Sequence, residues 1–285
     1  MDVTNTSPLV TVIVPAWHHE EYAEATLQSV CEQDHDAIEI IVVDDGSQPR
    51  VSRAICDYLD RGNVRPRFHR TVHVDGSGCA RIFQAINRGL GEAKGRFITV
   101  LEAGDVLPAT RFSRLVSTGA EREALLAFSR VEFRVVATSG SAVADYLYSV
   151  QDDIEFFPTV GYALLKSFSA VCIGNLFFSR ALADSIGGFG EFEYVCGWEF
   201  ALRSLLLTEP LFVPEPLYVR RVPAHQPGAQ QRQLEARETE AALKNYLFHC
   251  RNRRVANPIA PSPAWGPFFD SFVVESRYAG YLVKP

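Results

Sequence analysis

Apolar residues follow two different patterns in the first part of the chain. Runs rich in β-branched residues at 10–14, 38–43 and 97–101 predict strands that are buried on both faces. Between these runs, apolar residues recur at helical spacing over 20–33, 51–59 and 80–93, with a loop region before residue 80. Strands that alternate with helices predict a mainly parallel sheet with helices on its faces.

The pattern is less regular in the second half. Alternation over 124–136 predicts one long strand or a strand pair, and short apolar periodicities predict helices over 179–186 and 198–207. A charged helix with a narrow apolar stripe is predicted over 231–251. The segment 257–285 is rich in proline and aromatic residues, so we expect an irregular tail that packs on the domain or on a partner.

Composition removes some classes of function. The chain has 28 Lys and Arg against 34 Asp and Glu, whereas nucleic-acid binding needs a clustered excess of cations. We therefore expect no nucleic-acid partner, and an anionic ligand would need a metal or local donors. The six cysteines are scattered without a C-x-x-C pair, which favours buried thiols and a cytoplasmic protein. No signal peptide or long apolar run is visible, so no membrane span is expected.

An acidic turn, Asp44-Asp45-Gly46-Ser47, ends the second predicted strand. Ligands of open α/β sheets bind at the carboxyl edge of the strands, where this turn is expected to lie. Gly46 permits backbone angles that other residues resist, so the turn can present one carboxylate to a ligand. The structural alternative is a strand-ending turn that caps a helix.

Five motifs in a fixed order make the prediction more specific. They are VTVIVPAW at 10–17, EIIVVDDGS at 39–47, AINRG at 85–89 with GRFI at 95–98, LEAGD at 101–105, and GGFGE at 187–191 followed by WEFALR at 198–203. Together they resemble the family 2 glycosyltransferases of the GT-A fold. The resemblance implies a Rossmann-like α/β domain over 1–225 with a mixed, mainly parallel sheet and helices on both faces. Its 9–110 half would bind the nucleotide sugar, its 111–225 half would face the acceptor, and 226–285 would form a C-terminal helix and irregular tail packed on the domain.

The activity implied by the resemblance is inverting, metal-dependent transfer of a sugar from a nucleotide-diphosphate donor, a UDP-sugar, to an acceptor hydroxyl. The expected nucleotide-binding residues are Pro15, Ala16, Trp17, Glu20, Asp45, Gly78, Arg81 and Glu102. The Trp17 indole would stack on the base, and Asp45 would accept a hydrogen bond from a base N–H. Gly78 and Arg81 would lie near the diphosphate, with a helix-capping loop as the structural alternative.

The expected metal site departs from the family pattern. Relatives have Asp-x-Asp after the third strand, but this chain has Glu102-Ala103-Gly104-Asp105, with Gly104 in place of the second acid. Asp105 is therefore the expected ligand of Mn²⁺ or Mg²⁺, which would bridge the two phosphates. Glu102 could reach the ribose or a metal-bound water. His225 is a further candidate for the metal or the phosphate, and a surface histidine is its alternative.

The residues expected at the catalytic base depart further from the family pattern. Relatives place a Glu-Asp pair just before a tryptophan, and here Cys196 and Gly197 precede Trp198. Glu199 is the expected base, with Glu191 and Glu193 as alternatives. A structural role for Glu199 at the start of a helix stays open.

Two other classes of function are alternatives to sugar transfer. The missing acid pair supports a catalytically impaired member that binds a nucleotide or a partner. A nicotinamide-dependent oxidoreductase is disfavoured, because residues 15–18 lack the glycines of its nucleotide loop.

The implied partners are a nucleotide-sugar donor and a glycan or other hydroxyl acceptor. Polysaccharide biosynthesis is the usual setting of such relatives. Pairing with a second copy or with a partner glycosyltransferase is left open, as is peripheral association with the inner face of the membrane.

Overall fold

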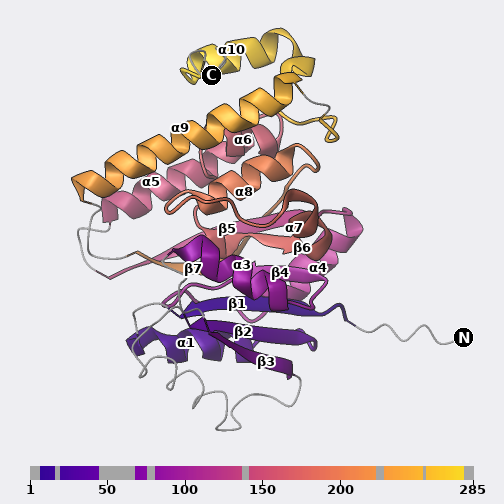
Figure 1. The fold of residues 1–285 in the computed structure, drawn as a ribbon, viewed down its shortest axis with the longest axis vertical. Helices are drawn as coiled ribbons and strands as arrows, with labels where there is room; N and C mark the ends of the chain where they lie inside the picture. The colour runs from indigo at the N-terminus through magenta and orange to yellow at the C-terminus, as the bar shows by residue number, and fades with distance from the viewer. Residues whose placement is uncertain are drawn as a thin grey trace, which may run out of the picture.

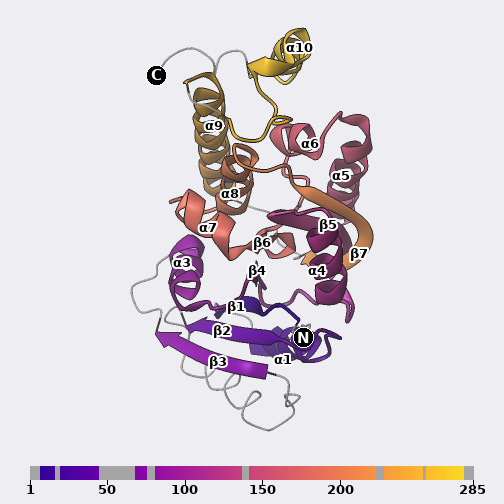
Figure 2. The same ribbon diagram turned by 90° about the vertical axis from the view of Figure 1, so that its right-hand side faces the viewer.

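A seven-stranded mixed sheet forms the centre of the protein (Figures 1 and 2). The computed structural model describes residues 7–16, 20–44, 68–75, 81–136, 141–222, 228–252 and 255–278, so the helix predicted over 51–59 lies outside the described residues. The strand order is β3-β2-β1-β4-β6-β5-β7. The strands are β1 (Val10–Ala16), β2 (Ile38–Asp44), β3 (Phe68–Asp75), β4 (Phe97–Val100), β5 (Leu126–Val135), β6 (Phe177–Ser179) and β7 (Leu211–Val222).

The pairing of the strands creates one shared carboxyl edge. β1 runs parallel to both β2 and β4, and β2 runs parallel to β3. Ala16 pairs with Asp44, and Ile13 pairs with Val100, so β1, β2 and β4 end close together. Of the described strands, only β6 runs against its neighbours, β4 and β5, while β7 is parallel to β5. The mixed, mainly parallel sheet predicted from the sequence is confirmed.

Helices cover both faces of this sheet. They are α1 (Glu20–Cys31), α3 (Ile82–Glu92), α4 (Arg111–Glu121), α5 (Ser141–Asp152), α6 (Val160–Lys166), α7 (Arg180–Ile186), α8 (Cys196–Leu205), α9 (Ala229–Asn252) and α10 (Pro267–Glu275). Alternate residues of a strand point to opposite faces. Ile13 and Ile41 accordingly belong to the core that includes α3 and α8, whereas Val12 and Ile40 belong to the core under α1 and α4.

The C-terminal part of the described chain packs on the domain. Helix α9 lies against α8 and buries Leu243 and Leu247, as Figures 1 and 2 show. The sequence predicts an irregular tail, but the structure contains helix α10 there. Phe269, Phe272 and Val273 lie on one face of α10 and are buried. Within the described part of the chain, no helix combines the length and the apolar character that crossing a bilayer requires.

Three strands, β3, β6 and β7, were not predicted. The segment of β3 was expected to be a loop, because polar residues interrupt it and it lacks the continuous apolar run of a strand buried on both faces. β7 contains Pro214 and Pro216, which normally argue against a strand. β3 and β7 lie at edges of the sheet, where a missing N–H is tolerated, and register shifts around Arg130 of β5 accommodate the prolines of β7.

Candidate functional site

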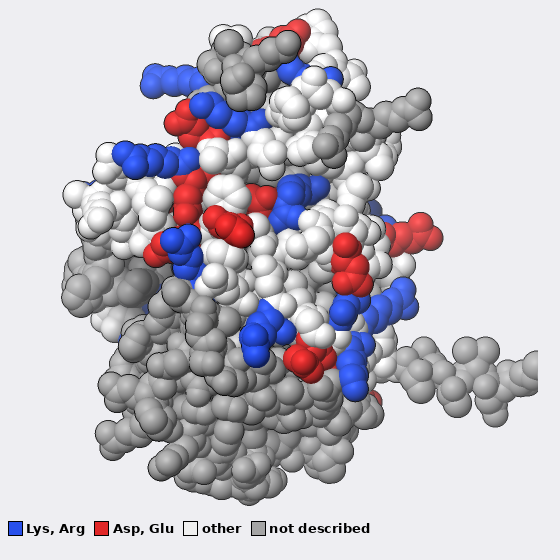
Figure 3. Space-filling model, viewed as in Figure 1, with Lys and Arg blue, Asp and Glu red and all other residues white. Residues whose placement is uncertain are grey.

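A cavity of about 600 Å³ opens beside the carboxyl end of β4. Its walls come from the segment after β4, from β7 and from helices α3, α5, α6, α8 and α9, together with the loops before α8 and after α6, and a volume of this size suits a small-molecule ligand. The charged and aromatic side chains in its lining are Glu102, Glu193, Glu235, Lys166, Arg220, Tyr146, Phe168, Tyr194 and Trp198. Figure 3 shows that both signs of charge are interspersed over the described part of one face of the molecule.

Glu102 is the acid that β4 brings to this cavity. The strand ends at Val100, and Leu101 N–H still donates to the Ile13 carbonyl, so the chain leaves the sheet at Glu102. Glu102 is half-buried and lines the cavity. Among the described residues, its carboxylate has no hydrogen-bonded partner. An acid in this position is available to a cation or to a hydroxyl group.

Asp105 lies behind Glu102 and is held by its neighbours. Tyr218 Oη donates to Oδ2 at 2.6 Å, and the Arg221 backbone N–H donates to Oδ1 at 2.9 Å. The Thr26 hydroxyl donates to the Asp105 carbonyl. Asp105 is only 4% exposed, and burial raises the pKa of its carboxyl to about 6, although the charge of Arg220 opposes the rise. Asp105 is thus a positioned, buried acid.

Gly104 shapes the turn between the two acids. Its φ is 99°, in the left-handed region that favours glycine. The Gly104 N–H donates to the Thr26 hydroxyl at 2.9 Å, and the Asp105 N–H donates to the Glu102 carbonyl at 3.2 Å. The glycine that replaces the second acid of the family pattern therefore allows the chain to fold back and bury Asp105.

Arg220 of β7 lines the same wall of the cavity. Burial lowers the pKa of its guanidinium, but the sulfur of Cys172 and the carboxylates of Glu102 and Asp105 raise it, and the net shift is upward. The guanidinium therefore stays charged and offsets part of the negative charge of the two acids.

These residues are candidates to hold a divalent cation whose coordination is completed by a ligand, although only Glu102 lines the cavity, while Asp105 lies outside the lining. Glu102 offers an unshared carboxylate, and each oxygen of Asp105 accepts one hydrogen bond and so keeps one lone pair. Mg²⁺ is commonly held by one or two carboxylates together with substrate phosphates and waters. The described residues contain no group of three His, Cys, Asp or Glu that could hold a metal unaided. His225 lies outside the described residues.

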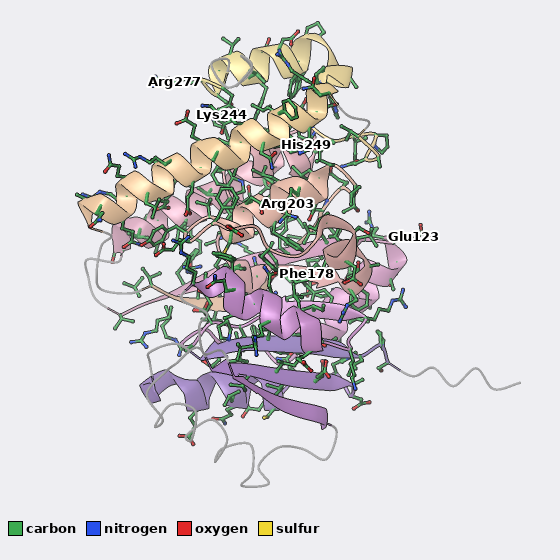
Figure 4. All side chains as sticks on the ribbon, viewed as in Figure 1. Glu123, Phe178, Arg203, Lys244, His249 and Arg277 are labelled. Atoms are coloured by element: carbon green, nitrogen blue, oxygen red, sulfur yellow. The ribbon has the colours of Figure 1, made fainter. Side chains whose placement is uncertain are left out.

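Glu199, the expected base, is engaged elsewhere. It accepts hydrogen bonds from Arg203, through Oε1 and at 2.7 Å through Oε2, and Arg203 also donates to the carbonyls of Ile186 and Gly188. Figure 4 labels Arg203 on α8. The Glu199 side chain is 4% exposed and is not part of the cavity lining. The pair thus ties α8 to the glycine-rich loop that follows α7.

Glu193, an alternative base, does line the cavity. Its side chain is 37% exposed, and its Oε2 lies 3.9 Å from Nε of Arg81 at the start of α3. Arg81, expected in the nucleotide-binding half, therefore lies next to Glu193 of the acceptor-side half. Glu191, the other alternative, is exposed and is not in the lining of this cavity.

The other predicted nucleotide-binding residues lie at the ends of β1 and β2 or beyond the described chain. Pro15 and Ala16 end β1, and Glu20 begins α1. Trp17, Asp45 and Gly78 lie outside the described residues. Their roles stay predictions.

Several residues of the cavity were not singled out from the sequence. Arg220 lies on β7, whose prolines hide the strand in the sequence pattern. Glu235, Gln231 and Thr239 come from α9, whose exposed face is charged all round and gives no reason to select one side. Lys166, at the end of α6, belongs to no motif that would have drawn attention to it.

Comparisons with known proteins indicate the family of the chain. The family model described as Glycosyl transferase family 2 matches residues 11–167, more than half of the 285 residues. TuaG, a Bacillus subtilis relative whose name carries teichuronic acid biosynthesis, is 29% identical over 147 residues, which cover 52% of this chain and 55% of TuaG. The chain spans between 37% and 61% of the length of three curated relatives that it matches.

Solved structures show the same fold. The mannosyltransferase PcManGT from Pyrobaculum calidifontis superposes with a TM-score of 0.64 at 18% identity, covering 99% of this chain and 77% of that one. The UDP complex of Staphylococcus aureus TarS superposes with a TM-score of 0.60 at 15% identity, covering 97% and 75%. The mixed sheet with helices on both faces is therefore a GT-A fold, and the chain belongs to glycosyl transferase family 2.

Proposed function

We propose that this chain transfers a sugar from a nucleotide-diphosphate donor to an acceptor hydroxyl, with inversion at the anomeric carbon. The observation that supports the proposal is that one cavity is lined both by Glu102, which follows β4, and by Glu193, which precedes α8. A cavity that contains two acids can hold a sugar near one acid that faces a leaving diphosphate and another that acts as a base.

The donor is proposed to be a UDP-sugar. Support comes from TarS, whose structures contain UDP or UDP-GlcNAc, whereas PcManGT contains GDP-Man. Trp17 and Asp45, beside the ends of β1 and β2, are the proposed base contacts, together with Pro15, Ala16 and Glu20. Gly78 and Arg81 are proposed to face the diphosphate.

A divalent cation, Mn²⁺ or Mg²⁺, would be held by Glu102 and Asp105, with His225 as a further proposed ligand. When bound, it would neutralise charge that develops on the leaving diphosphate. The Mn²⁺ in the complexes of PcManGT and of glucosyl-3-phosphoglycerate synthase from Mycobacterium tuberculosis supports this proposal. Arg220 would hold Asp105 charged and add positive charge beside the diphosphate.

The base is proposed to be Glu193. Its carboxylate would take the proton of the acceptor hydroxyl as the oxygen forms the new glycosidic bond and the bond to the nucleotide phosphate breaks. A single displacement of this kind inverts the anomeric carbon. Glu199 and Glu191 stay candidates from the sequence, but the contacts of Glu199 with Arg203 favour Glu193.

The acceptor is proposed to be a glycan, and polysaccharide assembly to be the setting. The rings of Tyr146, Phe168 and Tyr194 line the cavity, and aromatic faces offer large apolar surfaces to sugar rings.

A cytoplasmic location is proposed because the described cysteines are buried and form no disulfide bonds. They are Cys31, Cys172, Cys196 and Cys250.

A catalytically impaired, nucleotide-binding protein is the second candidate function. It is favoured by one observation: Cys196 and Gly197 occupy the place of the family's acid pair, and the adjacent Glu199 is bound to Arg203. A protein of this kind would bind UDP with a cation but would transfer no sugar.

Calorimetric titration with UDP tests the donor and metal proposals. We expect binding in Mn²⁺ to weaken at least about tenfold both in EDTA and in Glu102→Gln, because one cation contact is worth more than 1.4 kcal/mol. Glu132→Gln, which alters an exposed acid of β5, is the matched control. Unchanged affinity in EDTA would reject the metal, and absence of UDP binding would reject the donor.

A transfer assay separates the two candidate functions. UDP release is measured with a panel of UDP-sugars and glycan acceptors in Mn²⁺. Acceptor-dependent release supports transfer. Metal-dependent UDP binding without release across the panel supports the impaired protein instead.

A further inference from the structure

One carboxylate holds the segment that precedes α8. Glu238 of α9 accepts hydrogen bonds from the backbone N–H of Glu193 at 2.8 Å, of Tyr194 at 2.8 Å and of Val195 at 3.2 Å. Successive N–H groups of this kind form an anion-binding concavity. Hydrogen bonds to an ionised carboxylate are also stronger than those between neutral groups. Glu238 therefore fixes the backbone of 193–195 firmly.

The contact is long-range and has no local substitute. Val195 is the N-cap of α8, and its own side chain caps nothing. The donors at this helix start are satisfied by a residue 43 to 45 positions away in the sequence. Without Glu238, the half-buried N–H of Glu193 would lose its partner.

The same helix also closes the cavity. Gln231, Glu235 and Thr239 of α9 lie in its lining, at the spacing that places side chains on one face of a helix. Further along α9, Leu243 and Leu247 are buried. α9 thus combines a packing surface, a wall of the cavity and the anchor of the segment that carries Glu193.

We propose that Glu238 is a positioning residue for the acceptor side of the site. It holds the backbone of Glu193 and Tyr194 so that the carboxylate of Glu193 and the ring of Tyr194 face the acceptor. This role deepens the proposed function and rests on it for its effect on transfer, whereas its effect on the backbone can be measured without activity.

Hydrogen exchange tests the anchor directly. In Glu238→Ala, we expect the amides of residues 193–195 to exchange at least about tenfold faster than in the wild-type protein, because their acceptor is gone. Glu240→Ala is the control, since Glu240 lies on the same helix and pairs at 2.6 Å with exposed Lys244. Equal protection of these amides in Glu238→Ala and in the control would overturn the proposal.

Kinetics test the role in transfer. We expect Glu238→Ala to lower kcat/KM for the acceptor at least about tenfold, because small misplacements of a catalytic group cost that much. The KM of the donor and the affinity for UDP in Mn²⁺ should stay within about twofold, and Glu238→Gln, which keeps one acceptor oxygen, should recover part of the loss. An equal loss for donor and acceptor would overturn the positioning role.

The failure of the proposed function is distinguishable from the failure of this inference. If the wild-type protein binds UDP but transfers no sugar, the proposed function fails, and the exchange of the amides of 193–195 alone decides the anchor.

Discussion

Tyr218 donates a 2.6 Å hydrogen bond to Asp105, so β7, at one edge of the sheet, holds the acid that follows β4 in the middle of it. Both groups are buried, and the Arg221 N–H completes the arrangement from the same strand. The position of Asp105 therefore depends on a strand more than 100 residues later in the chain, as the sequence separation of 113 between the two partners shows.

The pH dependence of stability should report the buried Asp105. Its folded pKa of about 6 lies above the unfolded value, so the folded state binds more protons between about pH 4 and 6 and loses stability as pH rises through this range. Asp105→Asn does not titrate. We expect the free energy of unfolding of the variant, relative to wild type, to rise by about 2 to 3 kcal/mol from pH 4 to pH 6. Urea unfolding at both pH values measures this, and a constant difference would contradict it.

Glu193 and Glu199 should respond differently to the loss of charge. We expect Glu193→Gln to lower kcat at least about 100-fold while UDP binding in Mn²⁺ is unchanged, because only proton transfer is lost. Glu199→Gln should keep most of the turnover but lower the stability, since Arg203 loses its charged partner in a buried site. Kinetics and thermal unfolding of both variants separate the roles. A fully active Glu193→Gln beside an inactive, stable Glu199→Gln would return the base to Glu199.

Gly104 should not tolerate a side chain. Gly104→Ala places a Cβ on a residue with a φ of 99°, which costs about 1 to 2 kcal/mol. We expect lower stability and weaker UDP binding in Mn²⁺, because the turn orients Glu102 and Asp105. Gly91→Ala is the control, since Gly91 lies in α3 with open space where its Cβ would be. Equal behaviour of the two variants would argue against the strained turn.

The tail should contribute to the stability of the domain. Phe269 of α10 is 1% exposed, and Phe269→Ala is expected to cost about 3 to 5 kcal/mol of unfolding free energy. Val274→Ala on the same helix changes a side chain that is 65% exposed, so its cost should stay within about 0.5 kcal/mol. Guanidinium unfolding compares the two, and a small effect of Phe269→Ala would mean that α10 is not part of the core.

The sequence predicts well what local patterns encode. The strands at residues 10 and 38 are buried on both faces, so their apolar runs are unmistakable, and α3 shows its apolar stripe clearly. β3 and β7 lie at edges and carry polar residues or prolines, which is why their patterns indicate loops. α10 is short, and its spacing is hidden among prolines and aromatic residues.

The site is predicted less completely, because its contacts connect distant parts of the chain. Motifs indicate Glu102, Asp105 and Glu193 as candidates. The spacing of Glu199 and Arg203 on a predicted helix permits an ion pair, but only the structure shows that Arg203 also donates to the carbonyls of Ile186 and Gly188. Glu238 lies on a helix with many exposed charges, and only the structure shows that its carboxylate accepts hydrogen bonds from the backbone of residues 193–195.

The placement of α9 has a consequence for how such a protein can diverge. One wall of the cavity belongs to the end of β4, whereas α9 supplies another from a separate stretch of sequence. Substitutions at Gln231, Glu235 or Thr239 can reshape that wall without disturbing the register of β1, β2 and β4. Under the proposed function, preference for an acceptor would then change independently of the donor, through exchange of side chains along a single helix.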